Sequence, residues 1–122
     1  MIKKVAFTMY PVENLERARQ FYETVIGLKL SKISAQGGWI EYDLPGGGCF
    51  CLTNLVPELK PSAKSGGSIA FEVEDIEVLV KRLKEKEVQF KLDIYNSPVC
   101  RMAVIIDSEG NAVMLHQLHE KK

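Results

Sequence analysis

Residues 14–30 have the sequence NLERARQFYETVIGLKL, and the rest of the architecture can be worked out from this stretch. Its apolar residues recur every three or four positions, the spacing of a helix that buries one face. Asn14 can accept a hydrogen bond from a free backbone N–H at a helix start. Gly27 suits the left-handed conformation that ends many helices. The stretch therefore predicts a helix from about Leu15 to Gly27, followed by a strand that begins at Leu28.

The same pattern occurs a second time in the chain. VENLERA at residues 12–18 aligns with VEDIEVL at 73–79, with Asp75 in the place of Asn14. Short apolar and β-branched segments, separated by turn sequences such as PGGG and DSEGN, follow each helix. The strands expected from them are 4–12, 28–33, 39–44 and 49–53 in the first half, and 68–73, 90–94, 101–106 and 112–118 in the second. A repeat of this length indicates a duplicated fold.

The repeat predicts an α+β fold of two tandem β-α-β-β-β modules that form a cupped mixed sheet. We expect a single domain over residues 1–122, with a first module at about 1–54, a linker at 55–67 and a second module at about 68–119. In each module the helix should cover one sheet face and leave the other to line the cup. The second helix lacks a terminal glycine, and Glu87 lies about where one is expected.

Composition excludes several classes of function. Sixteen Lys and Arg balance sixteen Asp and Glu, so no basic field favours nucleic acid as a partner. The apolar runs are far shorter than a membrane span needs, and no signal peptide is indicated. The three cysteines form an odd number without a secretion signal. We therefore expect a cytoplasmic protein with reduced thiols and no membrane partner.

The chain resembles a known family in two places. NLERARQFYETVIGLKL, with its cap residue, FY pair and GL, and DSEGNAVML at 107–115 resemble signatures of the glyoxalase/bleomycin-resistance/extradiol dioxygenase (vicinal oxygen chelate) superfamily. Ser108 replaces the proline usual in the second signature. The resemblance implies a glyoxalase-like fold in a small single-domain member. The superfamily includes lyases, isomerases, dioxygenases and antibiotic binders, so the fold does not fix the function.

The resemblance also implies four metal-ligand positions, one on each of four strands and usually occupied by His or Glu. Carried onto this chain, they fall on Phe7, Cys51, Ser68 and Met114. None of these is a His or a carboxylate, and hard or borderline divalent ions need such donors. We therefore expect no metal and no cofactor at these positions, and expect the four residues to contact a ligand instead.

Strand alternation places further side chains on the wall of the cup. Trp39, Glu41, Met102 and His116 share the phase of the four positions. Glu41 or His116 could act as a general base, although an exposed strand carboxylate and a packed or solvated histidine are the simpler interpretations. Trp39 could stack on a planar ligand or belong to the core.

The cysteines have simpler interpretations than a thiol active site. Cys49 and Cys51 lie two apart on one strand, and about 6.5–7 Å between such positions is too far for an easy disulfide. Buried packing is the usual role of a free cysteine. A relocated metal site of Cys51, His116 and Glu41 is an alternative that no sequence spacing supports.

Two functions remain open. The first is a protein that binds a small, mostly apolar organic molecule in its cup without the usual divalent metal. The second is a lyase, isomerase or dioxygenase-type enzyme with Glu41 or His116 as base, with or without a nonstandard metal site. Whether the chain is an enzyme is left open by its sequence. The expected partners are a small-molecule ligand and a second copy of the chain in a homodimer.

Overall fold

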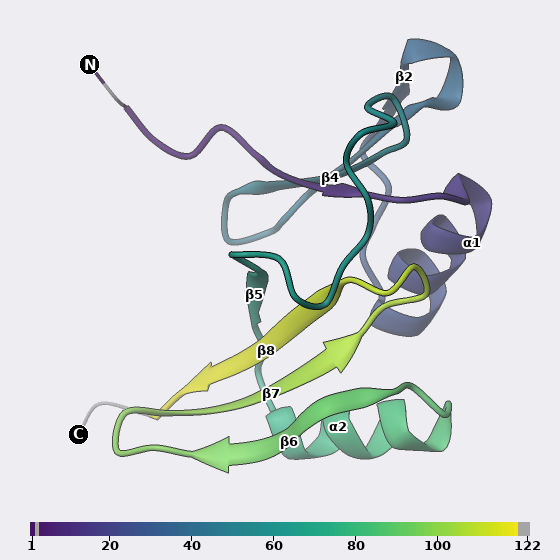
Figure 1. Cartoon of the computed structure of the whole chain (residues 1–122). Helices are drawn as coiled ribbons and strands as arrows, with labels where there is room; N and C mark the ends of the chain where they lie inside the picture. The colour runs from purple at the N-terminus through teal and green to yellow at the C-terminus, as the bar shows by residue number, and fades with distance from the viewer. Residues whose placement is uncertain (2, 120–122) are drawn as a thin grey trace. The chain divides into compact units, whose positions relative to one another are not determined.

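The structure is a computed structural model that describes residue 1 and residues 3–119. The chain divides into two compact units, Met1–Pro61 and Ser62–Lys122. Each unit holds one four-stranded mixed sheet and one α-helix (Figure 1). The α+β fold of two repeated β-α-β-β-β modules is therefore confirmed. The division falls inside the segment 55–67 expected as a linker, while the single domain over 1–122 stays a prediction.

The first unit contains four strands, one α-helix and two short helical segments of other types. Their bounds are β1 (Thr8–Pro11), α1 (Leu15–Gln20), the π-helix η1 (Phe21–Ile26), β2 (Lys32–Ser34), the 3-10 helix η2 (Ala35–Gly37), β3 (Trp39–Asp43) and β4 (Cys49–Thr53). The sheet order is β1-β4-β3-β2. Strand β1 runs parallel to β4, and the other pairs are antiparallel.

The second unit repeats this arrangement. Its elements are β5 (Ile69–Glu72), α2 (Ile76–Glu85), β6 (Phe90–Asn96), β7 (Cys100–Ile106) and β8 (Ala112–Leu118). The sheet order is β5-β8-β7-β6, with β5 parallel to β8. Figure 1 shows α2 running beside β6 and β7. The two units thus share one topology, as the sequence repeat predicts.

Both helices begin at the predicted caps. The side chain of Asn14 accepts a hydrogen bond of 2.9 Å from the backbone N–H of Arg17. Asp75 likewise accepts one of 3.2 Å from Val78. The first helix ends at Gly27, whose φ of 94° is left-handed. These contacts confirm the start and end signals found in the sequence.

The first helix differs from the prediction in its second half, where the α-helix becomes the π-helix η1. A π turn holds one more residue than an α turn, because its hydrogen bonds span five residues instead of four. Asp75 follows Asn14 by 61 residues, whereas Glu87, left-handed at φ 60°, follows Gly27 by 60. The π-helix accounts for this difference of one residue between the repeats.

Several strands have other bounds than expected. The first strand begins at Thr8 rather than at residue 4. Strand β2 covers Lys32–Ser34 rather than 28–33, since the N–H of Leu28 still bonds to Tyr22 at 2.8 Å and so closes the helix end. In the second unit, β6 extends to Asn96. These shifts come from hydrogen bonds at the element ends.

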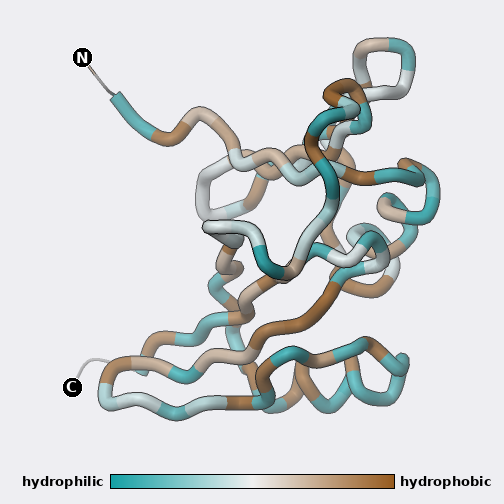
Figure 2. Tube along the Cα trace, viewed as in Figure 1, coloured by the Kyte–Doolittle hydropathy of each residue, from teal (hydrophilic) through white to brown (hydrophobic). Residues whose placement is uncertain are grey.

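Each sheet buries the face that its helix covers. In the first unit, the alternating residues Ile40, Tyr42, Phe50 and Leu52 are at most 1% exposed, and α1 contacts β4. In the second unit, the buried set from the strands and α2 is Phe71, Ala103, Ile105, Val113, Leu115, Ile76, Val80 and Leu83. Figure 2 shows β7 as a largely hydrophobic stretch. The opposite sheet faces therefore carry the candidate functional residues.

Among the described residues, no helix is both long enough and apolar enough to cross a membrane.

Candidate functional site

Strand register defines equivalent rows on the two open sheet faces. In the first unit, Met9 on β1 pairs with Cys51 on β4, which pairs with Glu41 on β3. In the second unit, the row on β5, β8 and β7 is Ala70, Met114 and Val104. Paired strand residues point to the same side of a sheet. Cys51 and Met114 therefore occupy matching places, as the repeat in the sequence implies.

The first open face carries an aromatic pair and a carboxylate. Phe7, just before β1, meets Trp39 edge to face with ring centroids 5.3 Å apart. The indole N–H of Trp39 donates a hydrogen bond of 3.0 Å to Oε2 of Glu41. Phe7 is 46% exposed, so it offers an apolar surface rather than core packing. This face thus combines a stacking surface with an oriented carboxylate.

The two cysteines of β4 lie closer together than the sequence suggested. Their Sγ atoms are 3.7 Å apart, and the thiol of Cys49 donates to Oε1 of Glu41 at 3.7 Å. The expected 6.5–7 Å describes the spacing of alternate residues along a strand. The side chains lean toward each other and remove much of that distance. The expectation that the thiols stand far apart is therefore wrong.

The surroundings of both thiols favour the neutral S–H form. Burial raises the pKa of Cys51 to about 12, and the neighbouring Cys49 thiol and the charges of Glu41 and Asp43 add to the effect. Burial also raises the pKa of Cys49, with the same two carboxylates contributing. Neither cysteine is therefore a ready thiolate nucleophile at neutral pH.

A hollow of about 400 Å³ opens beside these residues. Phe7, Glu41, Asp43 and Cys49 line it together with the backbone segment 4–6 and Gly48. Glu41, Cys49 and Cys51 also place their donor atoms within 4.8 Å of one another. Solvent and small solutes can therefore reach Glu41 and Cys49 directly.

The second open face carries a histidine–carboxylate pair. Nδ1 of His116 lies 2.6 Å from Oε1 of Glu72, and Oε2 of Glu72 accepts a hydrogen bond of 2.9 Å from the backbone N–H of Leu118. Both hydrogen bonds lower the pKa of the Glu72 carboxyl, and the one to His116 has the larger effect. A carboxylate at Nδ1 fixes the ring orientation and turns Nε2 toward other partners. His116 thus has the arrangement of an oriented base.

Sequence reasoning did not assign a role to Glu72. Strand alternation, by the phase of Ser68, does place it on the same side as His116. The pairing with His116, however, depends on the parallel register of β5 against β8, in which Glu72 lies opposite His116. That register is a property of the folded sheet and has no local signal.

The other predicted residues of this unit lie near the pair. Met102 is the cross-strand partner of His116, and Val104 is the partner of Met114. Ser68 precedes β5 and lines a hollow of about 580 Å³ with Leu92, Val104, Ala112 and the segment 63–67. By strand register, Phe7, Trp39, Glu41 and Cys51 thus belong to the open face of the first sheet, and Ser68, Met102, Met114 and His116 to that of the second.

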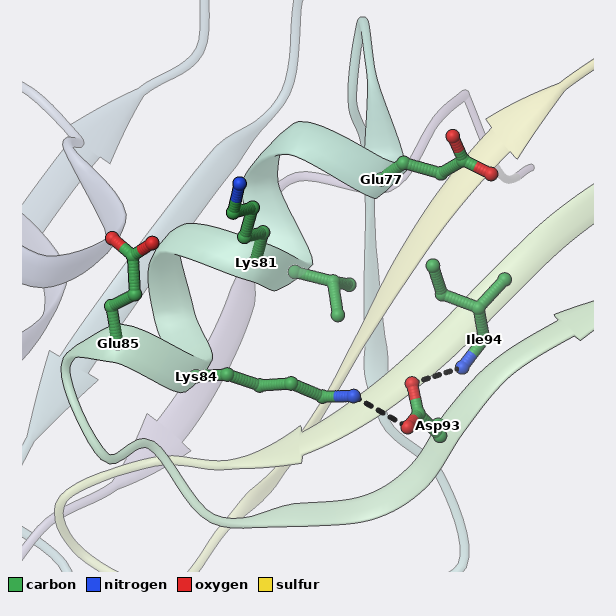
Figure 3. A pocket seen from close by; sticks show the side chains of 7 residues that line it. Glu77, Lys81, Lys84, Glu85, Asp93 and Ile94 are labelled. Carbon is green, nitrogen blue, oxygen red and sulfur yellow. Dashed lines mark hydrogen bonds and ion pairs between the residues drawn. The ribbon is translucent and has the colours of Figure 1, made fainter.

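A further groove of about 560 Å³ lies between α2 and β6 (Figure 3). None of the predicted site residues lines it. Lys84 reaches across it to Asp93, with 2.6 Å between Nζ and Oδ2. Glu77, Lys81 and Glu85 of α2 line the groove as well, together with the apolar side chains Val80 and Ile94.

Comparison with known proteins identifies the family. The sequence profile of the Glyoxalase/Bleomycin resistance protein/Dioxygenase superfamily matches residues 4–115. The chain belongs to this superfamily. The resemblance noted in the sequence is thereby confirmed. A comparison with curated proteins finds no match.

Solved superfamily structures resemble the chain over nearly its full length. TnmS3, an antibiotic binding protein from Streptomyces sp. CB03234, is 26% identical, with 97% of this chain and 98% of that chain covered and a TM-score of 0.81. A glyoxalase/bleomycin resistance protein from the same organism is 25% identical, with 91% and 97% covered and a TM-score of 0.78. The lactoylglutathione lyase from Agrobacterium tumefaciens, at 18% identity, 95% and 94% coverage and a TM-score of 0.74, shows the shared fold alone.

Proposed function

We propose that this superfamily member binds a small, mostly apolar organic molecule without the usual divalent metal of the superfamily. The observation that carries the proposal is the Phe7 ring, which occupies the first of the four superfamily ligand positions and packs edge-on against Trp39 at 5.3 Å. An exposed aromatic pair can stack on a planar ligand. A hard cation gains nothing from a phenyl ring.

The similarity to TnmS3 supports the same proposal. That protein is described as antibiotic binding, and the two chains cover each other almost completely. We extend the description to this chain as a class of ligand only: a small organic molecule with an aromatic or apolar surface. We also propose that the protein acts in the cytoplasm, where its three free cysteines stay reduced.

The test uses the single tryptophan of the chain, Trp39, as the reporter. Daunorubicin serves as a planar aromatic probe, and protein purified without chelator or affinity tag is also examined by native mass spectrometry for a retained organic molecule. We expect saturable quenching of Trp39, with Phe7→Ala weakening binding about tenfold, because an aromatic contact contributes about 0.5–1.5 kcal/mol beyond its buried area.

Val78→Ala is the control, since Val78 is exposed on α2. It should bind the probe like the unchanged protein. Non-saturable quenching, no retained molecule and equal behaviour of the Phe7 and Val78 variants would together contradict the proposal.

An enzyme is the second candidate, and the 2.6 Å contact between His116 and Glu72 favours it. The oriented imidazole could remove a proton from a bound molecule, as a general base does. Glu41, on the open face of the first sheet, is the alternative base. Conversion of the retained molecule in the same preparation, lost in His116→Gln but kept in Val78→Ala, would establish this candidate over simple binding.

A further inference from the structure

Three donor groups meet on the hairpin of β3 and β4. Glu41 pairs directly with Cys51 across the two strands, and Cys49 lies two residues before Cys51 on the same face. The Sγ–Sγ distance and the distance from Cys49 Sγ to Glu41 Oε1 are both 3.7 Å. All three donors come from adjacent strands of one sheet, so the fold of a single unit sets their geometry.

We propose that Glu41, Cys49 and Cys51 form a binding site for a thiophilic divalent cation of the Zn²⁺ type. This site takes only Cys51 from the four superfamily positions, and its other two donors, Glu41 and Cys49, lie outside them. It does not depend on the proposed ligand, because its three donors are complete without one.

The distances match tetrahedral coordination. Two thiolates at about 2.3 Å from Zn²⁺ lie about 3.8 Å apart in a tetrahedron. A thiolate and a carboxylate oxygen at about 2.1 Å lie about 3.6 Å apart. The observed 3.7 Å between the two thiols and between Cys49 and Glu41 is therefore within about 0.1 Å of what the metal requires. The third pair, Cys51 and Glu41, lies within 4.8 Å. Small side-chain movements suffice to bind the cation.

The type of donor selects the type of cation. Two sulfur donors exclude Mg²⁺ and Ca²⁺, which bind through oxygen, and favour Zn²⁺ or a similarly thiophilic ion. Together with the two thiolates, the single carboxylate makes a set of three protein ligands. The fourth position is left for water or a substrate atom, as in catalytic rather than structural zinc sites.

Neighbouring residues orient the ligands, set the local charge and leave the site open to the cation. The indole of Trp39 binds Oε2 of Glu41 and so leaves Oε1 directed at Cys49, an outer contact of the kind that orients metal ligands. Asp43, opposite Cys49, adds a second negative charge. Two lysines face these carboxylates: Lys4, which lines the hollow, and Lys32, which pairs with Glu41 across β2 and β3. The hollow gives access to Glu41 and Cys49, whereas Cys51 is buried. Binding releases both thiol protons to solvent.

The second unit provides an internal comparison. By strand register, Val104, Ala112 and Met114 are the equivalents of Glu41, Cys49 and Cys51. The same sheet geometry thus accepts three apolar side chains in these places. Packing therefore does not require a carboxylate and two thiols there, and their presence in the first unit needs another explanation.

The experiment titrates the reduced full chain with Zn²⁺ in competition with a chromophoric chelator, and with Co²⁺ as a spectroscopic probe. We expect one bound ion per chain and sulfur-to-cobalt charge-transfer bands. Cys49→Ala and Glu41→Val copy the equivalents Ala112 and Val104, so both variants should fold. Cys49→Ala should weaken Zn²⁺ binding about tenfold or more and remove much of the charge-transfer intensity, since it deletes a ligand.

Two controls separate this site from other thiols and histidines. Cys100→Ser and His116→Ala should bind Zn²⁺ like the unchanged chain, because Cys100 bonds to Ser97 and His116 to Glu72 in the other unit. In the unchanged protein, Zn²⁺ should also protect Cys49 from alkylation, measured by peptide mass spectrometry. Unchanged affinity in Cys49→Ala, absence of charge-transfer bands, or loss of binding in His116→Ala would overturn the proposal.

Discussion

Glu23 accepts hydrogen bonds from its own helix and from the sheet, and the bond from the sheet joins the two elements. Its carboxylate accepts one of 2.7 Å from Arg19 and one of 2.9 Å from the hydroxyl of the buried Tyr42. The hydrogen bond from Arg19 has the largest effect and lowers the pKa of Glu23. The bond from Tyr42 lowers it further. Burial in turn raises the pKa of the Tyr42 phenol, so the hydroxyl stays a donor at all ordinary pH values.

We predict that Glu23→Gln lowers stability at pH 7 by about 1 kcal/mol, because it removes a charge-assisted hydrogen bond and a partly buried ion pair. The folded-state pKa of Glu23 lies below its ordinary 4.5. Its contribution is therefore complete above about pH 4.5 and is lost as the pH falls through the folded value. Urea unfolding across this range should give a flatter acid limb for the variant.

Glu85→Gln is the matched control, since Glu85 is exposed on α2. It should leave the acid limb nearly unchanged. Equal slopes for the Glu23 variant and the unchanged chain would contradict the role given to the network.

Local signals explain which residues could be predicted and which could not. Asn14, Asp75 and Gly27 act on backbone groups a few residues away, and the sequence identified all three. The close approach of Cys49, Cys51 and Glu41 depends on the register of β3 against β4 and on side-chain rotamers. A sequence pattern shows the alternation of residues along a strand, but it shows neither the register between strands nor the side-chain rotamers.

The two helices end with different residues in the same strained conformation. Gly27 adopts φ 94°, and Glu87 adopts φ 60° at the end of α2. A left-handed residue with a Cβ costs roughly 1–2 kcal/mol relative to the ordinary helical conformation, and glycine avoids this cost. The sequence indicates that the second helix lacks a terminal glycine. The π-helix that sets the position of Gly27 in the first helix has no periodic signal.

We predict that Glu87→Gly stabilises the protein by about 0.5–1 kcal/mol, the strain relief minus the greater freedom of glycine in the unfolded chain. Urea or thermal unfolding measures the change. Gly27→Ala should have the opposite effect, because it introduces a Cβ at φ 94°, where no atom lies within 4 Å and only backbone strain acts. Destabilisation by Glu87→Gly would show that its side chain makes compensating contacts.

Each unit leaves one sheet face and two edge strands to be covered. The edges are β1 and β2 in the first sheet, and β5 and β6 in the second. The open faces carry half-exposed apolar residues, among them Phe7 and Leu92. A unit of about 60 residues buries only about 60% of its surface on folding, so its core alone is marginal. The stability of the whole protein therefore depends on what covers these faces.

We predict a homodimer, because exposed apolar faces and unpaired edges are stabilised by association, and two-fold dimers are the commonest assembly. Light scattering at micromolar concentration should give twice the chain mass of 13.7 kDa. Leu92→Lys places a charge on the open face of β6, where Leu92 pairs with Val104, and should shift the mass toward that of one chain. Val78→Lys on α2 should not. A single-chain mass for the unchanged protein would refute the dimer, and a dimeric Leu92 variant would assign the interface to other residues.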